Sequence, residues 1–268
     1  MIRLLKKVLQ GTGTALAFGL FGIAGIVFGL LVSPFLGLFV SNAAEHERAA
    51  RRVVRLWFAC FIRIIEGLGL VRVVLLNPER LERPGIIVAA NHPSLIDVVA
   101  LISRMDNAAV IVKDKLTRSP FTRAPIRAAG YVSNALGAAG LERATAALES
   151  GAAFVLFPEG TRTPASLPAG KAPRMHRGAA ALALASRRPI TPVRIHAEPR
   201  WLTKDRGWWH LPEKPMTLTL EVLPDIDSAD LLDRYNERPS AAVRALSKRL
   251  ARALFPHLEE IDHEPPAH

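Results

Sequence analysis

The chain has 268 residues, enough for one good-sized domain with a substantial core and an attachment segment. Half of its residues are hydrophobic, a composition that argues against disorder over most of the chain. The formal net charge of +11 favours anionic partners, such as an acidic membrane surface or a phosphorylated substrate. Nucleic acid is not favoured, because no nucleic-acid-binding motif is present. The single cysteine, Cys60, excludes an internal disulfide, and its apolar surroundings predict a buried packing thiol.

An uncharged stretch runs from Val8 to Ala44. It exceeds the ~20 residues that span a bilayer core, and it is too long for the roughly 7–15-residue apolar region of a signal peptide. Pro34 can divide it into two helices. We therefore expect residues 1–44 to be a membrane-embedded helical segment, with a removed signal peptide as the alternative.

Basic residues flank this stretch on both sides, so charge gives no orientation to a single span. Two arrangements stay open: one span, or a helix–break–helix that enters one leaflet and returns. The flanking residues are Arg3, Lys6, Lys7, Arg48, Arg51, Arg52 and Arg55.

Residues 45–268 are predicted to form one domain of alternating helices and strands. A helix over 45–70 shows apolar residues at helical spacing, and short runs of β-branched residues indicate strands. The alternation predicts an α/β fold, a mixed sheet flanked by helices, after an N-terminal membrane-embedded helical segment. The predicted strands cover 71–76, 85–90, 109–112, 153–157, 189–195 and 216–222, and the further helices 96–103, 141–150, 178–186 and 240–255.

The most informative segment reads Ala-Ala-Asn-His-Pro-Ser-Leu-Ile-Asp, from 89 to 97. A predicted strand leads directly into His92, and such strand ends are the usual site position in α/β proteins. The first helical turn brings Asp97 back towards His92. An acidic partner on one ring nitrogen fixes the tautomer, so the other nitrogen can take a proton from an alcohol attacking an acyl thioester. Alone, this spacing fits a capping or packing histidine equally well.

A second buried strand leads into Phe-Pro-Glu-Gly-Thr-Arg, residues 157–162. Gly160 permits a tight backbone, and Arg162 offers a planar fork for a phosphate group. Glu159 can accept a hydrogen bond from a substrate hydroxyl or hold Arg162. Alone, this segment is an ordinary turn.

Together the two segments resemble the glycerolipid acyltransferase family, typified by 1-acyl-glycerol-3-phosphate acyltransferases. That family carries Asn-His-x4-Asp followed by Phe-Pro-Glu-Gly-Thr-Arg, and both motifs are complete here, in that order. A Lys-x-x-Leu-x3-Pro block and an apolar-Pro-Val strand also match, so the resemblance covers 71–222. The residues that fill these two weaker blocks are Lys113, Leu116, Pro120, Gly130, Tyr131, Val132 and 190–193.

The resemblance implies an O-acyltransferase that moves a fatty acyl group from acyl-CoA or acyl carrier protein to the hydroxyl of a lysophospholipid of the 1-acyl-glycerol-3-phosphate type. It implies His92 as the general base and Asp97 as its orienting partner. The thioester is a co-substrate, and no cofactor or metal is expected. The implied substrate-binding residues are Asn91, Ser94, Lys113, Glu159, Gly160, Thr161 and Arg162.

The same resemblance implies a role in phospholipid biosynthesis, with a membrane lipid acceptor and an anionic membrane surface as partners. It places the protein at the cell inner membrane with its active site facing the cytoplasm. Residues 133–136 hold no basic residue where many members have one assigned to acceptor phosphate. The alternatives are therefore the same chemistry on a lyso-ornithine lipid or polyene glycolipid, or a non-catalytic lipid-binding membrane protein.

Three of the four tryptophans, Trp201, Trp208 and Trp209, lie among basic residues. Tryptophan favours the bilayer interface and basic residues favour anionic headgroups, so this stretch is a candidate membrane contact. The alternative is a β-hairpin that packs its tryptophans on the core.

Overall fold

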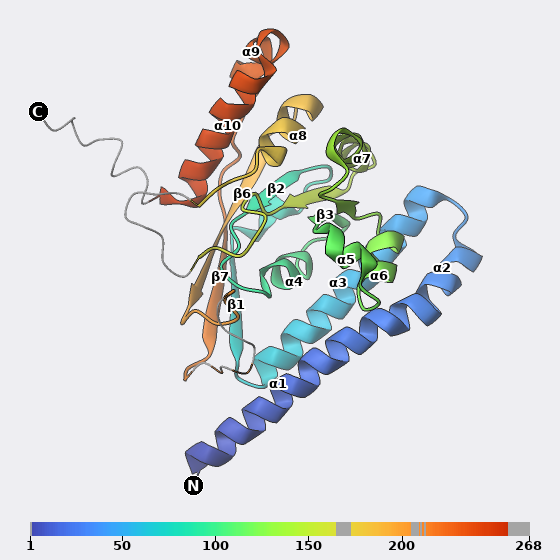
Figure 1. Ribbon diagram of the computed structural model, residues 1–268, viewed down its shortest axis with the longest axis vertical. Helices are drawn as coiled ribbons and strands as arrows, with labels where there is room; N and C mark the ends of the chain where they lie inside the picture. The colour runs from blue at the N-terminus through green and yellow to red at the C-terminus, as the bar shows by residue number, and fades with distance from the viewer. Residues whose placement is uncertain (1, 165–172, 205–208, 210, 212, 257–268) are drawn as a thin grey trace, which may run out of the picture.

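A central sheet with helices on both faces forms the body of the molecule, and a long helix lies outside one helical layer (Figure 1). The computed structural model describes residues 2–164, 173–204, 209, 211 and 213–256, and gives the backbone alone for residues 2–9. Within these residues the sheet order is β1-β7-β6-β2-β5-β3-β4. The strands are β1 (Val71–Leu76), β2 (Ile87–Ala90), β3 (Ala108–Val112), β4 (Val132–Ser133), β5 (Ala153–Leu156), β6 (Ile190–Glu198) and β7 (Met216–Val222).

The sheet is mixed, as the sequence predicted. Strands β6 and β7 pair antiparallel, and every other neighbouring pair is parallel. Strands β2, β5 and β3 therefore end at the same edge, which places the turns after β2 and β5 side by side. The predicted fold class, an α/β mixed sheet flanked by helices, is confirmed.

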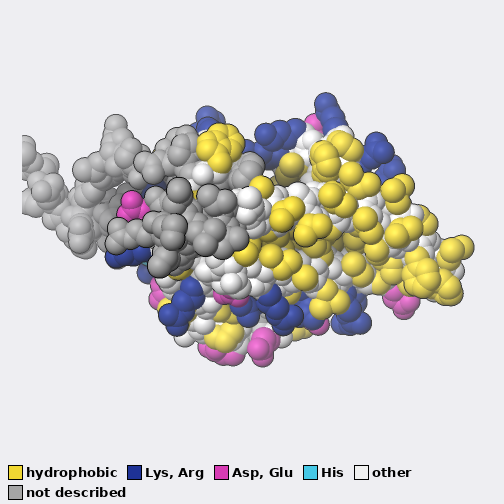
Figure 2. All heavy atoms as spheres, turned by 90° about the horizontal axis from the view of Figure 1, so that it is seen from below, with side chains coloured by type: hydrophobic (Ala, Val, Ile, Leu, Met, Phe, Trp, Pro, Cys, Tyr) yellow, Lys and Arg dark blue, Asp and Glu magenta, His cyan; other side chains and the backbone are white. Residues whose placement is uncertain are grey.

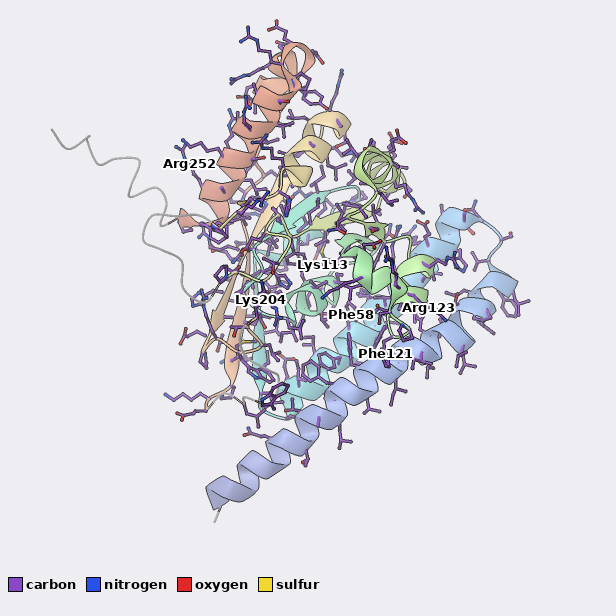
Figure 3. All side chains as sticks on the ribbon, viewed as in Figure 1. Phe58, Lys113, Phe121, Arg123, Lys204 and Arg252 are labelled. Carbon is purple, nitrogen blue, oxygen red and sulfur yellow. The ribbon has the colours of Figure 1, made fainter. Side chains whose placement is uncertain are left out.

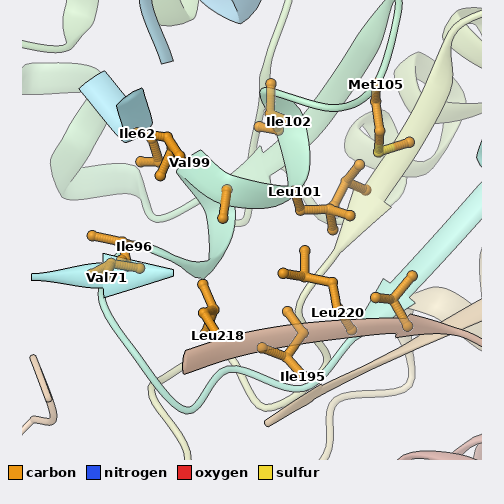
Figure 4. Close-up of a cluster of buried hydrophobic side chains, with 14 of the residues drawn as sticks. Ile62, Val71, Ile96, Val99, Leu101, Ile102, Met105, Ile195, Leu218 and Leu220 are labelled. Carbon is orange, nitrogen blue, oxygen red and sulfur yellow. The ribbon is translucent and has the colours of Figure 1, made fainter. Parts of the chain in front are cut away.

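Both faces of the sheet are buried because successive strand residues point to opposite sides. In β2, Val88 and Ala90 pack in one core cluster, whereas Ile87 and Ala89 pack in the other. Figure 4 shows part of the first cluster, in which Val99 and Leu101 lie on the same side of the sheet as Leu218 and Leu220. The first face is covered by α3 (Ala43–Gly67) and α4 (Asp97–Ile102), and the second by α7 (Gly137–Glu149), α8 (Gly178–Ser186) and α10 (Pro239–Leu254).

Short elements account for most of what the sequence pattern missed. Each of them spans six residues or fewer, too few to show a helical or strand period. Helix α3 begins two residues earlier than predicted. Asn42 caps it there, because its side chain accepts hydrogen bonds from the backbone N–H groups of Ala44 and Glu45. The missed elements are η2 (Pro78–Leu81), α5 (Asp114–Arg118), α6 (Arg123–Ala128), β4, η3 (Ala229–Leu231) and α9 (Leu232–Glu237).

The N-terminal segment is one continuous helix, built from α1 (Ile2–Val27), the π-helical turn η1 (Phe28–Val32) and α2 (Ser33–Phe39). The break that Pro34 allows is absent from this segment, because the helix continues through Ser33–Phe39. In the π-helical turn the backbone N–H of Ser33 bonds to the carbonyl of Phe28, five residues earlier. This wider turn gives room just before the proline ring, which would clash with a regular α-helical carbonyl. By length and composition, Gln10–Phe39 is a candidate membrane span, with a mean hydropathy of 2.5.

The helical hairpin of α1–α2 and α3 is held by aromatic packing. The ring of Phe21 lies 4.7 Å from the ring of Trp57 and 4.7 Å from that of Phe61. Cys60 is exposed on α3, so its predicted burial is wrong: the helix turns the neighbouring Phe61 into the core instead. The boundary predicted between residues 44 and 45 stays a prediction.

The tryptophan-rich stretch divides between core and surface. Trp201 is buried in the cluster between the sheet and α4, which contradicts its expected membrane contact. Trp209 is exposed. Trp208 lies outside the described residues.

Gly25 lets α1 approach the turn between α5 and α6. A Cβ at Gly25 would overlap the backbone carbonyl of Phe121, whereas a Cβ at Gly19, in the same helix, would meet nothing within 4 Å. Figure 3 shows Phe121 and Phe58 beside α1 and α3.

Two matched substitutions test this contact. We expect Gly25→Ala to lower the free energy of unfolding by about 1–3 kcal/mol, because overpacking forces the backbone apart. Gly19→Ala should raise it by roughly 0.5–1 kcal/mol, the helix-propensity gain of alanine over glycine. Thermal unfolding of both variants in the same detergent measures the difference. Equal effects of the two substitutions would show that the contact does not constrain α1.

Candidate active site

His92 follows the carboxyl end of β2 directly, and Asp97 is the first residue of α4. Nδ1 of the His92 ring lies 2.9 Å from Oδ2 of Asp97. The same carboxylate oxygen accepts the backbone N–H of Ser94 at 2.7 Å. The chain between His92 and Asp97 therefore folds back on itself, and the carboxylate closes the loop. With Nδ1 donating to Asp97, the Nε2 atom of His92 is the nitrogen able to accept a proton.

Asp97 is completely buried. Burial raises the pKa of its carboxyl group, and the hydrogen bonds from His92 and Ser94 oppose that rise. The two donors therefore stabilise the charged form at a place where the surrounding core disfavours it. A carboxylate in this setting orients the imidazole strongly, because no solvent competes for the contact.

Glu159 and Thr163 hold the backbone of His92. Oε1 of Glu159 accepts the N–H of His92 at 2.9 Å and the hydroxyl of Thr163 at 2.7 Å. The backbone N–H of Thr163 donates to the carbonyl of His92 at 2.7 Å. The motif after β5 thus fixes the motif after β2. Thr163 was missed from the sequence, although it stands immediately after the second motif.

Three buried polar atoms around the imidazole have no hydrogen-bond partner among the described residues. They are Oγ of Ser94, Oδ1 of Asp97 and Oε2 of Glu159. Burial also raises the pKa of the Glu159 carboxyl group. Unpaired buried polar atoms are uncommon in folded proteins, and their grouping beside one histidine marks this place as a candidate site.

Asn91 extends the pairing of β2 with β6. Its side-chain Oδ1 accepts the N–H of Ile195 at 2.6 Å, and its Nδ2 donates to the carbonyl of Ile195 at 2.8 Å. Both ends of the amide are therefore occupied by backbone. A direct substrate contact, as the resemblance implies for Asn91, stays a prediction, whereas the contact seen here ties the loop after β2 to the sheet.

Replacing Asn91 tests this tie. Asn91→Ala should lower the free energy of unfolding by about 1–3 kcal/mol, because the N–H and carbonyl of Ile195 lose their partners in a buried place. Chemical denaturation provides the measurement. Asn134→Ala serves as the control, since Asn134 is exposed and accepts a single hydrogen bond from Asp114. The tie is unimportant if both variants unfold at the same denaturant concentration.

The sequence left open whether Glu159 holds Arg162 or accepts a hydrogen bond from a substrate hydroxyl. In the structure Arg162 does not bond to Glu159. Its Nη1 donates to the carbonyls of Leu202 and Thr203, at 2.8 Å and 2.7 Å. Gly160 has a φ of +61°, and a Cβ there would lie 2.9 Å from the ring of His176. Glycine is favoured at this position both by the backbone conformation and by this close approach.

The remaining predicted residues lie around this centre. Lys113 immediately precedes α5 and is exposed, and Thr161 is half-buried. Neither side chain has a hydrogen-bond partner within the described part of the chain. Groups of three or more His, Cys, Asp or Glu side chains suited to a metal ion are likewise absent there.

Comparison with known proteins identifies a family and a fold. Residues 72–196 match the Acyltransferase family, a range that contains both the His92 loop and the Arg162 turn. This part of the chain is an acyltransferase domain. The resemblance to the glycerolipid acyltransferase family seen in the motifs is thereby confirmed. A search of curated proteins gives no match to the chain.

The acyltransferase fold extends over the whole chain. The crystal structure of the 1-acyl-sn-glycerophosphate (LPA) acyltransferase PlsC from Thermotoga maritima matches with a TM-score of 0.65 and 19% sequence identity. The match covers 99% of this chain and 100% of the other. At this identity the likeness concerns the fold alone. The roles of the individual site residues stay predictions.

Proposed function

We propose that this acyltransferase moves a fatty acyl group from acyl-CoA or acyl carrier protein to the hydroxyl of a lysophospholipid of the 1-acyl-glycerol-3-phosphate type. The observation that carries the proposal is the contact between His92 and Asp97 inside the matched domain. The shared fold with a lysophosphatidic acid acyltransferase supports the acceptor class.

His92 is the general base in this reaction. Its Nε2 takes the proton of the acceptor hydroxyl as that oxygen attacks the carbonyl carbon of the thioester. The tetrahedral intermediate then expels the thiolate, and His92 returns the proton to it. Asp97 holds Nδ1 protonated and stabilises the imidazolium between these steps. The products are the diacylated lipid and the free thiol, and no cofactor takes part.

Removing the imidazole tests this assignment. His92→Ala should lower kcat by roughly 10²–10⁴-fold, the usual contribution of a positioned general base, without unfolding the protein. Acyl transfer to 1-acyl-glycerol-3-phosphate, with the product identified by mass, is the measurement. His196→Ala is the matched control, because His196 is an exposed residue of β6. Near-normal turnover in the His92 variant would rule the base out.

The acceptor of such a reaction lies in a membrane. The exposed surface of the N-terminal helix is suited to membrane contact. Figure 2 shows a broad hydrophobic surface with Lys and Arg side chains along its edges. The exposed hydrophobic side chains of the N-terminal helix include Leu20, Leu31, Phe35 and Leu38, with Leu31 65% exposed and Leu38 80% exposed. Burial of such area in lipid is favourable by about 25 cal/mol per Å², and basic rims add attraction to anionic lipid. We propose that this surface embeds in the inner membrane, with the site facing the cytoplasm.

Flotation of the full chain after a carbonate wash tests the embedding. The wild-type protein should stay with the vesicles, since apolar burial does not depend on salt or pH. Leu31→Glu combined with Phe35→Glu should shift it towards the soluble fraction, because two charges would have to enter lipid. Leu76→Glu, an exposed leucine at the end of β1, is the control. Release of the wild-type chain by the wash would show that the protein binds the membrane only peripherally and is not embedded.

A further inference from the structure

The turn between α5 and α6 packs on glycines of the N-terminal helix. A Cβ at Gly25 would overlap the backbone carbonyl of Phe121, and a Cβ at Gly29 would lie 2.8 Å from the Cβ of Ala124. The two glycines are four residues apart, so they lie on one side of the helix. The turn of the catalytic domain therefore touches the middle of the apolar stretch Gln10–Phe39.

The ring of Phe121 is 48% exposed although it lies against α1 (Figure 3). It is next to Gly22, where a Cβ would be 3.6 Å from the ring. Ile26, four residues after Gly22, lies on the same side of α1 and is exposed, as is Leu30 one turn later. The exposed apolar surface of the helix therefore continues onto Phe121. Lipid that covers Ile26 and Leu30 would cover this ring as well.

The turn is held in place by its own hydrogen bonds. The backbone N–H groups of Thr122 and Arg123 both donate to the carbonyl of Ser119. The hydroxyl of Thr122 donates to the carbonyl of Leu116 at 2.6 Å. The backbone of Phe121 is therefore fixed relative to α1, and the turn keeps its place when the helix enters lipid.

The same turn is basic. Lys115 and Arg118 of α5 and Arg123 of α6 are exposed. The single acidic residue between positions 113 and 123, Asp114, pairs with Arg118. Lys115 and Arg123 form no ion pair with any residue that the structure describes. An exposed apolar ring with basic neighbours is typical of a surface that binds anionic lipid.

We propose that the α5–α6 turn is a second membrane contact, made by the catalytic domain itself: Phe121 enters the apolar layer beside α1, and Lys115 and Arg123 bind anionic headgroups. The proposal extends the embedding of the N-terminal helix proposed above and rests on it. A helix that lies in a membrane can still rotate about its own axis, and a contact away from that axis stops the rotation. The turn therefore determines how the domain that carries His92 is oriented over the membrane.

Depth-dependent fluorescence quenching in the full chain tests this contact. Cys60→Ser removes the only cysteine, and Pro120→Cys then carries one dye on the exposed part of the turn, with Phe121 intact. In phosphatidylcholine–phosphatidylglycerol vesicles with nitroxide-labelled acyl chains, this dye should be strongly quenched, at a depth of roughly 5–10 Å into the headgroup–acyl boundary. Leu76→Cys, at the exposed end of β1, is the control and should keep its emission. Equal quenching at the two positions would overturn the proposal.

Further variants separate the ring from the charges. Phe121→Ser should reduce the quenching at position 120 in every vesicle. Lys115→Gln combined with Arg123→Gln should reduce it only where phosphatidylglycerol is present, because the lost attraction is electrostatic. Arg244→Gln combined with Lys248→Gln, two exposed basic residues of α10, is the control for charge. Unchanged quenching in both turn variants would show that neither the ring nor the charges hold the turn in lipid.

A dye on Leu38→Cys reports on the N-terminal helix separately. Quenching at 38 without quenching at 120 would refute the turn contact and leave the embedding of the helix standing. No quenching at either position would refute both. Acyl transfer is measured on the same labelled chains: quenching at 120 in a protein that transfers no acyl group would refute the proposed reaction and leave the membrane contact standing.

Discussion

The carboxylate of Asp97 lies in the interior, at the start of a helix whose remaining residues are apolar. A charge at such a depth is costly unless donors surround it, and His92 and Ser94 supply them. Much of the surrounding structure follows from this requirement. The loop must turn sharply after β2 to bring both donors to one oxygen atom, and Glu159 and Thr163 must then hold the turned backbone from the neighbouring strand. The two motifs are therefore one structural unit, although the first ends at Asp97 and the second begins only at Phe157.

The sequence predicted most of the strands and the long helices well, because each is marked by an apolar run or an apolar period that the fold buries. Strand β7 and helix α8 begin and end where the pattern placed them. It predicted the contact between His92 and Asp97 for a similar reason, since both lie on one short local turn. What it missed depends on distant parts of the chain. Thr163 supports His92 because β5 packs beside β2. Arg162 bonds to the carbonyls of residues 202 and 203 because the segment after β6 packs beside the same turn.

The helical hairpin and the catalytic domain are in direct contact at the turn between α5 and α6. Phe121 in that turn touches α1 at Gly25, and Lys113 stands at the other end of α5. Lys113 therefore lies one short helix away from the contact with α1.

The π-helical turn between Phe28 and Val32 has a consequence for the surface on each side of it. Phe28, Val32 and Leu36, spaced four residues apart, all pack against α3 or α6. In a regular α-helix, positions four apart drift around the axis by about 40° at each step. The wider π-helical turn offsets this rotation, so Phe28, Val32 and Leu36 stay on the same side of the helix on both sides of the proline. Leu31, Phe35 and Leu38 consequently remain exposed on the outer side, and the continuous helix presents a single apolar side along its length.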